Sequence, residues 1–257
     1  RNQEIPETLN SFVRGILEIQ TGLLGLKNTS PLVVYEFQRP SPDQLLIQFL
    51  VPTKRLERKL RTHLSIEIPG IGFDKGYTGL PLAPEDLVGG GMLTTGRKDR
   101  FPLRSEFNSP PINGLVALLH RHAMMDTRFV VQILFQPVAG NPVREEVRRQ
   151  QGYKTVGYLR KEKDLALSSR SATPRERQQA NAVEQKLGQR RYWVSIRFAV
   201  IGAGKYTPSR VKELAGGFNI FENPETGQYL NIYTLNSVRR KRFIEFYRAV
   251  RSREFKG

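Results

Sequence analysis

The sequence has no cysteine and only three histidines among its 257 residues. Without cysteine the chain forms no disulfide, holds no thiolate-bound metal and uses no cysteine nucleophile, and its redox compartment is left undetermined. His120 and His122 are two residues apart, which places them on nearly opposite sides of a helix, and no H-E-x-x-H motif is present. The sequence therefore predicts neither a metal site nor a bound cofactor.

The motifs of several enzyme classes are also missing. The sequence contains no G-x-S-x-G and no close pair of carboxylates of the kind that glycosidases and two-metal nucleases use. The stretch "AVIGAGKYT" (199–207) resembles a phosphate-binding P-loop, but Lys205 is followed by Tyr206 where a P-loop needs a hydroxyl for magnesium. We predict instead a strand-to-helix turn with Thr207 as the N-cap. The chain is therefore expected to have no catalytic activity of its own.

Acidic residues are scarce relative to basic ones. The chain has 41 Lys and Arg against 24 Asp and Glu, a formal net charge of +17 and a sequence pI of about 10.4. A protein this basic favours a polyanionic partner, first of all nucleic acid, with an anionic membrane surface or an acidic protein of a large assembly as alternatives. No apolar run approaches the roughly 18 residues that span a bilayer. We expect a cytoplasmic location, with association with a membrane-bound or multi-protein complex left open.

Two stretches carry most of the excess charge. Residues 139–191 hold 13 basic and 6 acidic residues (+7), and residues 238–257 hold 8 and 2 (+6), together +13 of the +17. Arginine binds phosphate bidentately, and nearby aromatic residues such as Tyr153 and Tyr158 can stack on bases. Alternatively, the two basic stretches are charged surfaces that contact only solvent. We predict sequence-independent phosphate contacts, with DNA favoured over RNA, from Arg144, Arg148, Arg149, Lys154, Arg160, Lys161, Lys163, Arg239, Arg240, Lys241, Arg242, Arg248, Arg251 and Arg253.

Apolar periodicity predicts two similar segments. The first has a helix from Pro6, strands at 32–38 and 44–51, a helix at 53–64 and a short strand at 65–70. The second has strands at 100–107, 128–138, 192–201 and 229–235, with helices at 111–122 and 207–217. "VVYEFQRP" (33–40) is similar to "VVQILFQPV" (130–138), and "LLIQFLVPTKRLERKL" to "VSIRFAVIGAGKYTPSRVKEL". We predict an α+β fold of two tandem ferredoxin-like (βαββαβ) units, the first lacking its opening strand, which we expect upstream of Arg1.

The corresponding domain boundaries follow from composition. Residues 1–70 form the first unit, and 71–99 form a linker loop because they contain three consecutive glycines and two prolines. Residues 100–237 form the second unit, with a basic insertion at 139–190, and residues 238–257 form a basic C-terminal helix. Within the insertion, Thr173, Pro174 and Glu176 are typical of a capped helix start, and Gly188 of its end.

The order of motifs adds a family resemblance. "FPLRSEF", "PINGLVALLHRH" and "RFVVQILFQPV" are followed by "TPRERQQANAVEQKL", "YWVSIRFAVIG", "FNIFENPETGQYLN" and "RRKRFIEFYRAVRSREF". This series resembles the region that precedes the motor in conjugative, type IV secretion coupling ATPases of the HerA/FtsK-like kind, over roughly Pro6 to Phe255. In that family the following motor carries the nucleotide-binding motifs, and this sequence stops before any such motor. The resemblance implies a non-catalytic accessory module of a DNA-translocation or conjugation-type machine.

A second function class remains open. The chain can also be a structural or assembly protein of a large complex, which docks through sheet edges and basic arms. Its partners would then be other proteins or further copies of itself. Gel-filtration mass and a pull-down after nuclease treatment distinguish this alternative from nucleic-acid binding.

Overall fold

One antiparallel sheet runs through the described part of the chain. The computed structural model describes residues 17–22, 27–76, 88–108, 111–121, 127–139, 142–161, 171–235 and 250. The elements are β1 (Val33–Ser41), β2 (Gln44–Leu50), α2 (Lys54–Glu67), β3 (Val88–Thr95), α3 (Pro111–Arg121), β4 (Arg128–Pro137), α4 (Pro142–Arg160), α5 (Pro174–Leu187), β5 (Tyr192–Ile201), η2 (Gly204–Tyr206), α6 (Thr207–Gly216), η3 (Gly217–Phe221) and β6 (Leu230–Leu235). The fold is α+β, as predicted.

The six strands lie in the order β2-β1-β4-β5-β3-β6, and every neighbouring pair is antiparallel. The longest pairing joins β4 to β5, from Arg128 opposite Ile201 to Pro137 opposite Tyr192. The pairing of β1 with β4 brings strands from both predicted units into one sheet. Strands β2, β4, β5 and β6 were predicted within one residue of their observed ends, and β1 continues to Ser41, three residues beyond the predicted end at 38.

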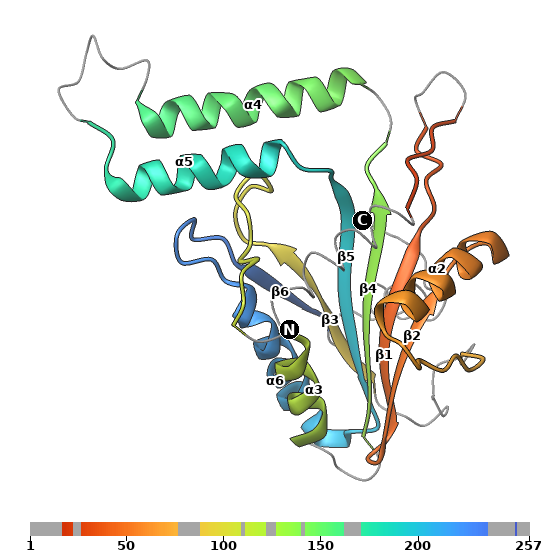
Figure 1. Cartoon of the computed structure of the whole chain (residues 1–257). Helices are drawn as coiled ribbons and strands as arrows, with labels where there is room; N and C mark the ends of the chain where they lie inside the picture. The colour runs from red at the N-terminus through yellow and green to blue at the C-terminus, as the bar shows by residue number, and fades with distance from the viewer. Residues whose placement is uncertain are drawn as a thin grey trace.

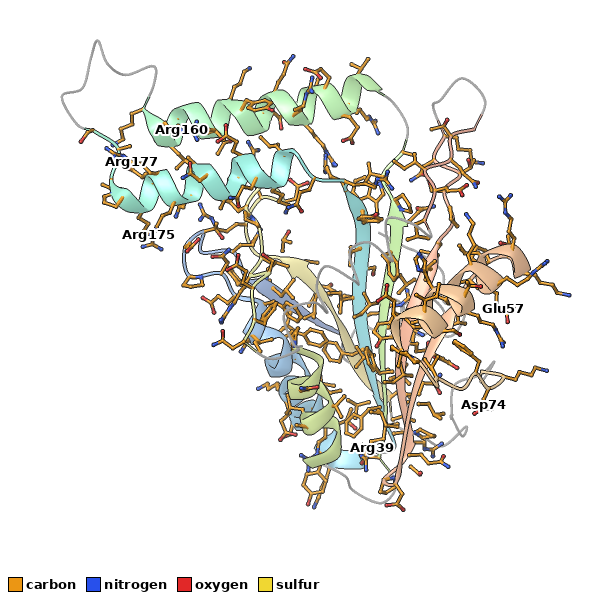
Figure 2. All side chains as sticks on the ribbon, in the orientation of Figure 1. Arg39, Glu57, Asp74, Arg160, Arg175 and Arg177 are labelled. Atoms are coloured by element: carbon orange, nitrogen blue, oxygen red, sulfur yellow. The ribbon has the colours of Figure 1, made fainter. Side chains whose placement is uncertain are left out.

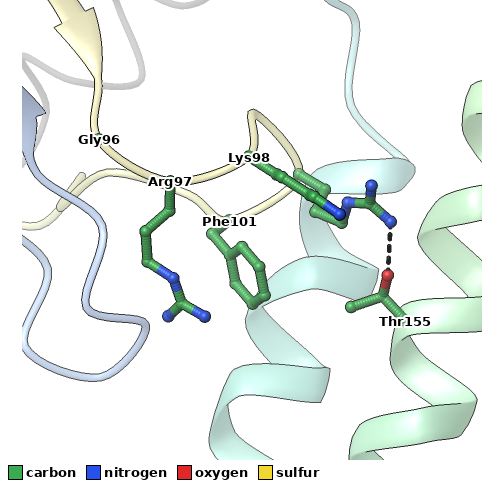
Figure 3. A pocket seen from close by; sticks show the side chains of 6 residues that line it. Gly96, Arg97, Lys98, Phe101 and Thr155 are labelled. Atoms are coloured by element: carbon green, nitrogen blue, oxygen red, sulfur yellow. Dashed lines mark hydrogen bonds between the residues drawn. The ribbon is translucent and has the colours of Figure 1, made fainter.

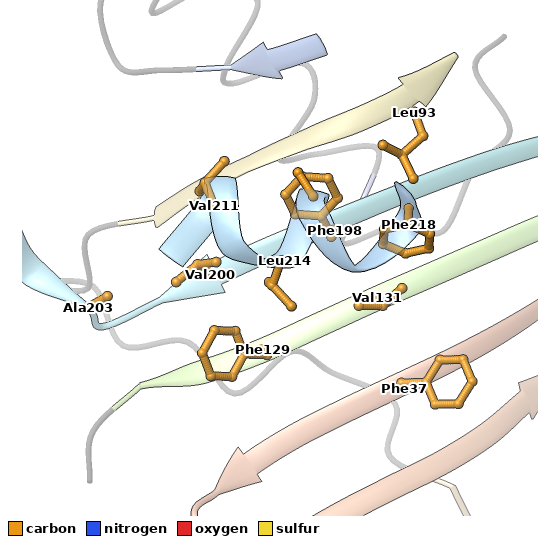
Figure 4. Packing of buried hydrophobic residues seen from close by; sticks show 11 residues of the cluster. Phe37, Leu93, Phe129, Val131, Phe198, Val200, Ala203, Val211, Leu214 and Phe218 are labelled. Atoms are coloured by element: carbon orange, nitrogen blue, oxygen red, sulfur yellow. The ribbon is translucent and has the colours of Figure 1, made fainter. Parts of the chain in front are cut away.

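Helices α2, α3 and α6 cover one face of the sheet (Figure 1). On this face Phe37, Val131 and Phe198 are direct cross-strand neighbours, and Val211 and Leu214 of α6 pack against their cluster (Figure 4). Leu56 and Leu60 of α2 cover the β1–β2 end. Burying each such side chain stabilises the fold by about 1.5–3 kcal/mol. The core therefore lies between this face of the sheet and the apolar sides of α2 and α6.

The opposite face carries a buried polar row. Gln48, Glu36, Gln132 and Arg197 lie side by side on β2, β1, β4 and β5. Gln48 donates to Glu36 Oε1 at 2.6 Å, Gln132 donates to Glu36 Oε2 at 2.5 Å, and Arg197 Nε donates to Gln132 Oε1 at 2.8 Å. Gln132 also donates to the carbonyl of Val250 at 2.9 Å. Since Glu36 and Gln132 are wholly buried and Arg197 is 1% exposed, these hydrogen bonds satisfy groups that water cannot reach.

Strand β3 lies where the sequence predicted a linker loop, so that prediction is wrong for residues 88–95. Its consecutive glycines allow close packing instead of a turn. A Cβ atom on Gly89 would lie 2.4 Å from Thr207 Cγ2, and one on Gly91 would lie 2.9 Å from the carbonyl oxygen of Tyr233. Helix α6 and strand β6 can therefore approach β3 only because these positions have no side chain.

Two predicted strands are absent from the described residues. Residues 100–107 form no strand, because Pro102 has no N–H to donate and the N–H of Arg104 donates to the carbonyl of Phe221 in η3. Residues 65–70 also form none, because α2 continues to Glu67 and the chain then turns at Gly70, whose φ is +85°. The predicted helix that begins at Pro6 lies outside the described residues as far as Ile16, and its continuation at 17–22 is not helical, since Thr21 instead forms an isolated bridge with Asn28. Nearly all of 238–257 also lies outside the described residues.

The turn at 202–207 also differs from its prediction. Thr207 is the first residue of α6 and not its N-cap, and its hydroxyl donates to the carbonyl of Gly204 at 2.7 Å. A short 3-10 turn, η2, precedes the helix, and its last residue, Tyr206, is the N-cap, without a side-chain capping bond. The segment is a strand-to-helix connection, as the sequence indicated. No helix in the described part of the chain is long and apolar enough to cross a bilayer.

Candidate nucleic-acid interface

The predicted basic insertion contains two antiparallel helices, α4 and α5, which project from the sheet at the end of β4 and the start of β5 (Figure 1). Val156 of α4 packs with Ala180 and Val183 of α5 and with Phe101 from the loop after β3. Gly152 allows close contact, since a Cβ atom there would lie 2.4 Å from Leu187 Cδ2. The helical pair therefore has a small core of its own.

The start of α5 is as predicted. The hydroxyl of Thr173 accepts the N–H of Glu176 at 3.3 Å, and the Glu176 carboxylate accepts the N–H of Thr173 at 2.7 Å, with Pro174 in the first turn. These two reciprocal bonds form a capping box. The N–H and then the hydroxyl of Thr173 hold the pKa of Glu176 below its ordinary value.

Three predicted phosphate-binding residues of this region form ion pairs within the chain. Arg160 lies 2.6 Å from Glu184, Lys161 lies 3.6 Å from Glu176, and Arg149 lies 2.6 Å from Glu146. The first two pairs join α5 to the end of α4 and to the residue that follows it. Their charge is thus partly neutralised, which sequence spacing alone did not reveal.

Arg148 has a further partner of another kind. Its guanidinium lies 5.0 Å from the ring centre of Trp193, within cation–π range. One of its terminal nitrogens, Nη1, is buried without a hydrogen-bond partner. Arg148 therefore fixes the base of α4 on β5 and offers less to an external anion than the sequence suggested.

Two predicted residues are exposed cations. Arg144 and Lys154 are exposed and form no ion pair with the described residues. Lys154 shares one side of α4 with Tyr158, four residues later and 76% exposed, and with Val147, seven residues earlier and 47% exposed. We call the exposed surface formed by Val143, Arg144, Val147, Lys154 and Tyr158 the outer face of α4.

Sequence reasoning missed two further cations. Arg175 and Arg177 lie in the first turns of α5, at the same end of the helical pair as Arg160 (Figure 2). Both are exposed and form no ion pair with the described residues. Cations at a helix N-terminus are unfavourable for the helix dipole, so helix stability does not explain them. They lie among the residues of the capping signature, Thr173, Pro174 and Glu176, which indicates a helix start and not a binding role.

Eight predicted site residues lie outside the described residues. They are Lys163, Arg239, Arg240, Lys241, Arg242, Arg248, Arg251 and Arg253. Their role in phosphate contact stays a prediction.

A basic cleft opens between the loop after β3 and the second half of α4. It has a volume of about 470 Å³ and is lined by Gly96, Arg97, Lys98, Arg100, Phe101 and Thr155 (Figure 3). Arg97 stacks 4.0 Å from the centre of the Phe101 ring. Arg100 donates to Thr155 Oγ1 at 2.6 Å and to the carbonyl of Gln151 at 2.9 Å. Three cations from one short loop thus surround the cleft, and none of them was predicted as a site residue.

The loop of the cleft is held rigidly by buried polar side chains. Gln228, wholly buried, donates to the carbonyls of Arg97, Lys98 and Phe101 at 3.2, 3.2 and 3.0 Å. Its Oε1 accepts the N–H of Arg97 at 2.8 Å. Thr226, also wholly buried, donates to the carbonyl of Pro102 at 2.9 Å. The positions of the loop backbone are therefore set before any ligand arrives.

The acidic residue of this loop is paired elsewhere. Asp99 lies 3.3 Å from Arg191, which also lies 2.9 Å from Glu145. Lys186 donates to the carbonyls of Asp99 and Phe101, and burial lowers its pKa, with Asp99 raising it and Arg191 lowering it further. Because Asp99 is neutralised by Arg191, the cleft keeps the charge of its three cations.

Comparison with known proteins gives one match. A family model described as "Domain of unknown function (DUF8128)" matches residues 1–257. No curated protein matches the chain, and no solved structure matches it.

Proposed function

The chain belongs to the DUF8128 family, and since that membership assigns no activity, we propose a function from the surface itself: sequence-independent contact with the phosphates of nucleic acid, DNA in the first place. In this proposal the protein is a non-catalytic accessory module of a DNA-translocation or conjugation-type machine. The phosphate contacts come from the α4–α5 pair, with the C-terminal basic residues as a second contact region.

The observation that carries the proposal is the set of cations at the projecting helical pair. Arg144, Lys154, Arg175 and Arg177 are exposed and form no ion pair with the described residues. Tyr153 and Tyr158, 52% and 76% exposed on α4, supply rings on which bases can stack. Exposed cations beside exposed aromatics form the combination by which proteins track a nucleic-acid backbone without reading its sequence.

The proposal that the module belongs to such a machine is supported by the sequence and not by the surface. The order of motifs along the chain resembles the region before the motor of conjugative coupling ATPases. Such a region needs affinity for DNA of any sequence, and contacts through phosphates provide it. Catalysis is assigned to the motor and not to this chain.

Fluorescence anisotropy with short labelled DNA of two unrelated sequences tests the function. Both sequences should bind equally, and if about six phosphates are neutralised, affinity should fall around a thousandfold between about 50 and 200 mM salt. Affinity that is flat across this range, or strong preference for one sequence, contradicts the proposal.

A structural role is the second candidate, and the sheet edge favours it. Strand β2 is the last strand on its side of the described sheet, and it exposes Leu45 (37%) and Ile47 (51%). Exposed apolar edge strands are sites at which another chain can add a strand. Gel-filtration mass together with a pull-down from nuclease-treated extract decides: a complex that survives nuclease supports assembly, and a complex lost with the nucleic acid supports phosphate contact.

We infer that the sheet consists of two ferredoxin-like units. Strands β3, β4, β5 and β6 occur in the order βαββαβ with α3 and α6, and the first and third strands lie between the second and the fourth. This arrangement is the split βαβ plan, in which β3 takes the place of the opening strand predicted at 100–107. The α4–α5 pair is then an insertion between the second and third strands of this unit.

The pairing register supports a related, shorter first unit. Glu36 lies opposite Gln132, and half a turn about an axis between them exchanges β1 with β4. The same rotation exchanges β2 with β5 and places Gln48 on Arg197, because these two residues lie opposite Glu36 and Gln132. It also keeps α2 and α6 on one face. In this register Val33 corresponds to Phe129, one residue away from the match that the sequence alone suggests.

A further inference from the structure

The cleft beside Thr155 of α4 is lined by three cations and by no acidic residue. Arg97, Lys98 and Arg100 lie within one short loop, and the only acidic residue of that loop, Asp99, pairs with Arg191. Lys98 is exposed, and its side chain forms no ion pair or hydrogen bond with the described residues (Figure 3). Three like charges this close in sequence repel one another, and an anion between them would relieve that repulsion.

Two of the three cations are already oriented. Arg97 is stacked on Phe101 and donates to the carbonyl of Thr226, and Arg100 donates to Thr155 and Gln151. A guanidinium has five N–H groups, so each arginine keeps donors for a ligand. The backbone that carries them is fixed by Gln228. Little side-chain or loop entropy is therefore lost when an anion binds.

We propose that this cleft is a phosphate-binding site. Arg97 and Arg100 donate to the phosphate oxygens from positions fixed by the protein, and Lys98 closes on the phosphate as a mobile point charge. The cleft lies beside α4, so a strand of nucleic acid on the outer face of α4 can place one backbone phosphate in it. The source of the phosphate rests on the proposed function, while the chemistry of the site does not.

Two probes separate these claims. Inorganic pyrophosphate, measured by calorimetry, tests the cleft alone, and short labelled single-stranded DNA, measured by anisotropy, tests the cleft within the proposed function. Lys98→Gln should weaken both by about tenfold, as expected for one hydrogen bond to a charged group. Lys98→Arg keeps the charge and should retain binding. Lys75→Gln removes an exposed cation after α2 and is the matched control.

The outcomes are distinct. Loss of both affinities in Lys98→Gln but not in Lys75→Gln supports the site. DNA binding that ignores Lys98, with no pyrophosphate binding, overturns the site and leaves the proposed function standing. Pyrophosphate binding that needs Lys98, without any DNA binding, overturns the proposed function and assigns the site to a small phosphorylated compound. Failure of both probes to bind overturns both.

Discussion

At the scale of single residues, the buried polar row of Gln48, Glu36, Gln132 and Arg197 constrains how the strands align. Glu36 accepts hydrogen bonds from Gln48 and Gln132 while wholly buried. A buried carboxylate is tolerated only when its oxygens are fully hydrogen-bonded, so the row ties the alignment of β2, β1, β4 and β5 to one arrangement. A slip of one residue would turn the row toward the helices and break it.

A charge exchange within the row tests both its energetics and the proposed duplication. Glu36→Gln should lower the free energy of unfolding by about 1–3 kcal/mol, because amide donors then face an amide that cannot accept them all. Gln132→Glu alone should also destabilise, since two carboxylates become neighbours. The double variant should recover at least about 1 kcal/mol relative to the sum, because Arg197 then donates to a carboxylate.

Urea unfolding followed by circular dichroism provides these values. Glu67→Gln, at an exposed position on α2, is the control and should leave the midpoint unchanged. If the effects of the two single variants simply add in the double variant, the row does not act as one network. The row would then no longer support the proposed twofold axis between Glu36 and Gln132.

At the scale of elements, the capping box of α5 fixes the start of the helix that carries Arg175 and Arg177. Thr173→Ala should cost about 1 kcal/mol at neutral pH. The N–H and then the hydroxyl of Thr173 lower the folded-state pKa of Glu176. The alanine variant keeps the N–H, so only the hydroxyl–carboxylate bond that it removes depends on pH: this part is present above the unfolded-state pKa and is lost as the pH falls through the folded-state value. The difference between wild type and Thr173→Ala should therefore shrink in acid.

Amide hydrogen exchange in the first turn of α5, measured across that pH range, tests the capping prediction. Thr62→Ala, exposed on α2, is the matched control and should not change exchange in α5. Equal exchange rates in wild type and Thr173→Ala at neutral pH would contradict the assigned role.

Strand β3 gives a second prediction at this scale. A Cβ atom on Gly91 would lie 2.9 Å from the Tyr233 carbonyl and 3.0 Å from Phe198, so Gly91→Ala should force the backbone apart and cost about 1–3 kcal/mol. Gly72→Ala, at a position with open space, should be neutral or slightly stabilising. Thermal unfolding of both variants decides, and equal melting temperatures would count against the close packing of β3.

These elements also show what the sequence could reveal. Apolar periodicity identified the strands and helices whose one face is buried, and the Thr173 signature identified the start of α5. Strand β3 escaped because its glycines are placed for neighbours that are distant in sequence. The basic helical pair was predicted from composition, but the pairing of Arg160 with Glu184 depends on tertiary contact. Arg97 and Lys98 fall in the stretch predicted as a linker (71–99) and Arg100 begins the stretch predicted as a strand (100–107), so the sequence did not group the three cleft cations.

At the scale of the whole molecule, the charge is divided between internal and external roles. Arg197 serves the buried row, and Arg191 and Arg160 hold the helical pair in place. Of the exposed remainder, the proposed interface uses the cations on the outer face of α4, at the start of α5 and in the cleft, while others such as Arg58 and Lys75 lie elsewhere. Only this remainder can release counterions from a nucleic acid, so the salt dependence of binding should reflect fewer contacts than the total basic content suggests.

The most direct test of nucleic-acid contact is the salt dependence of DNA affinity in wild type and in the double variant Arg144→Gln/Lys154→Gln. If both residues contact phosphate, the slope of log affinity against log salt should become shallower by about 1.4–1.8. The control Arg58→Gln/Lys75→Gln removes the same charge from exposed positions elsewhere and should keep the wild-type slope. An identical slope in all three proteins, or no DNA binding by the wild type at low salt, would contradict the account.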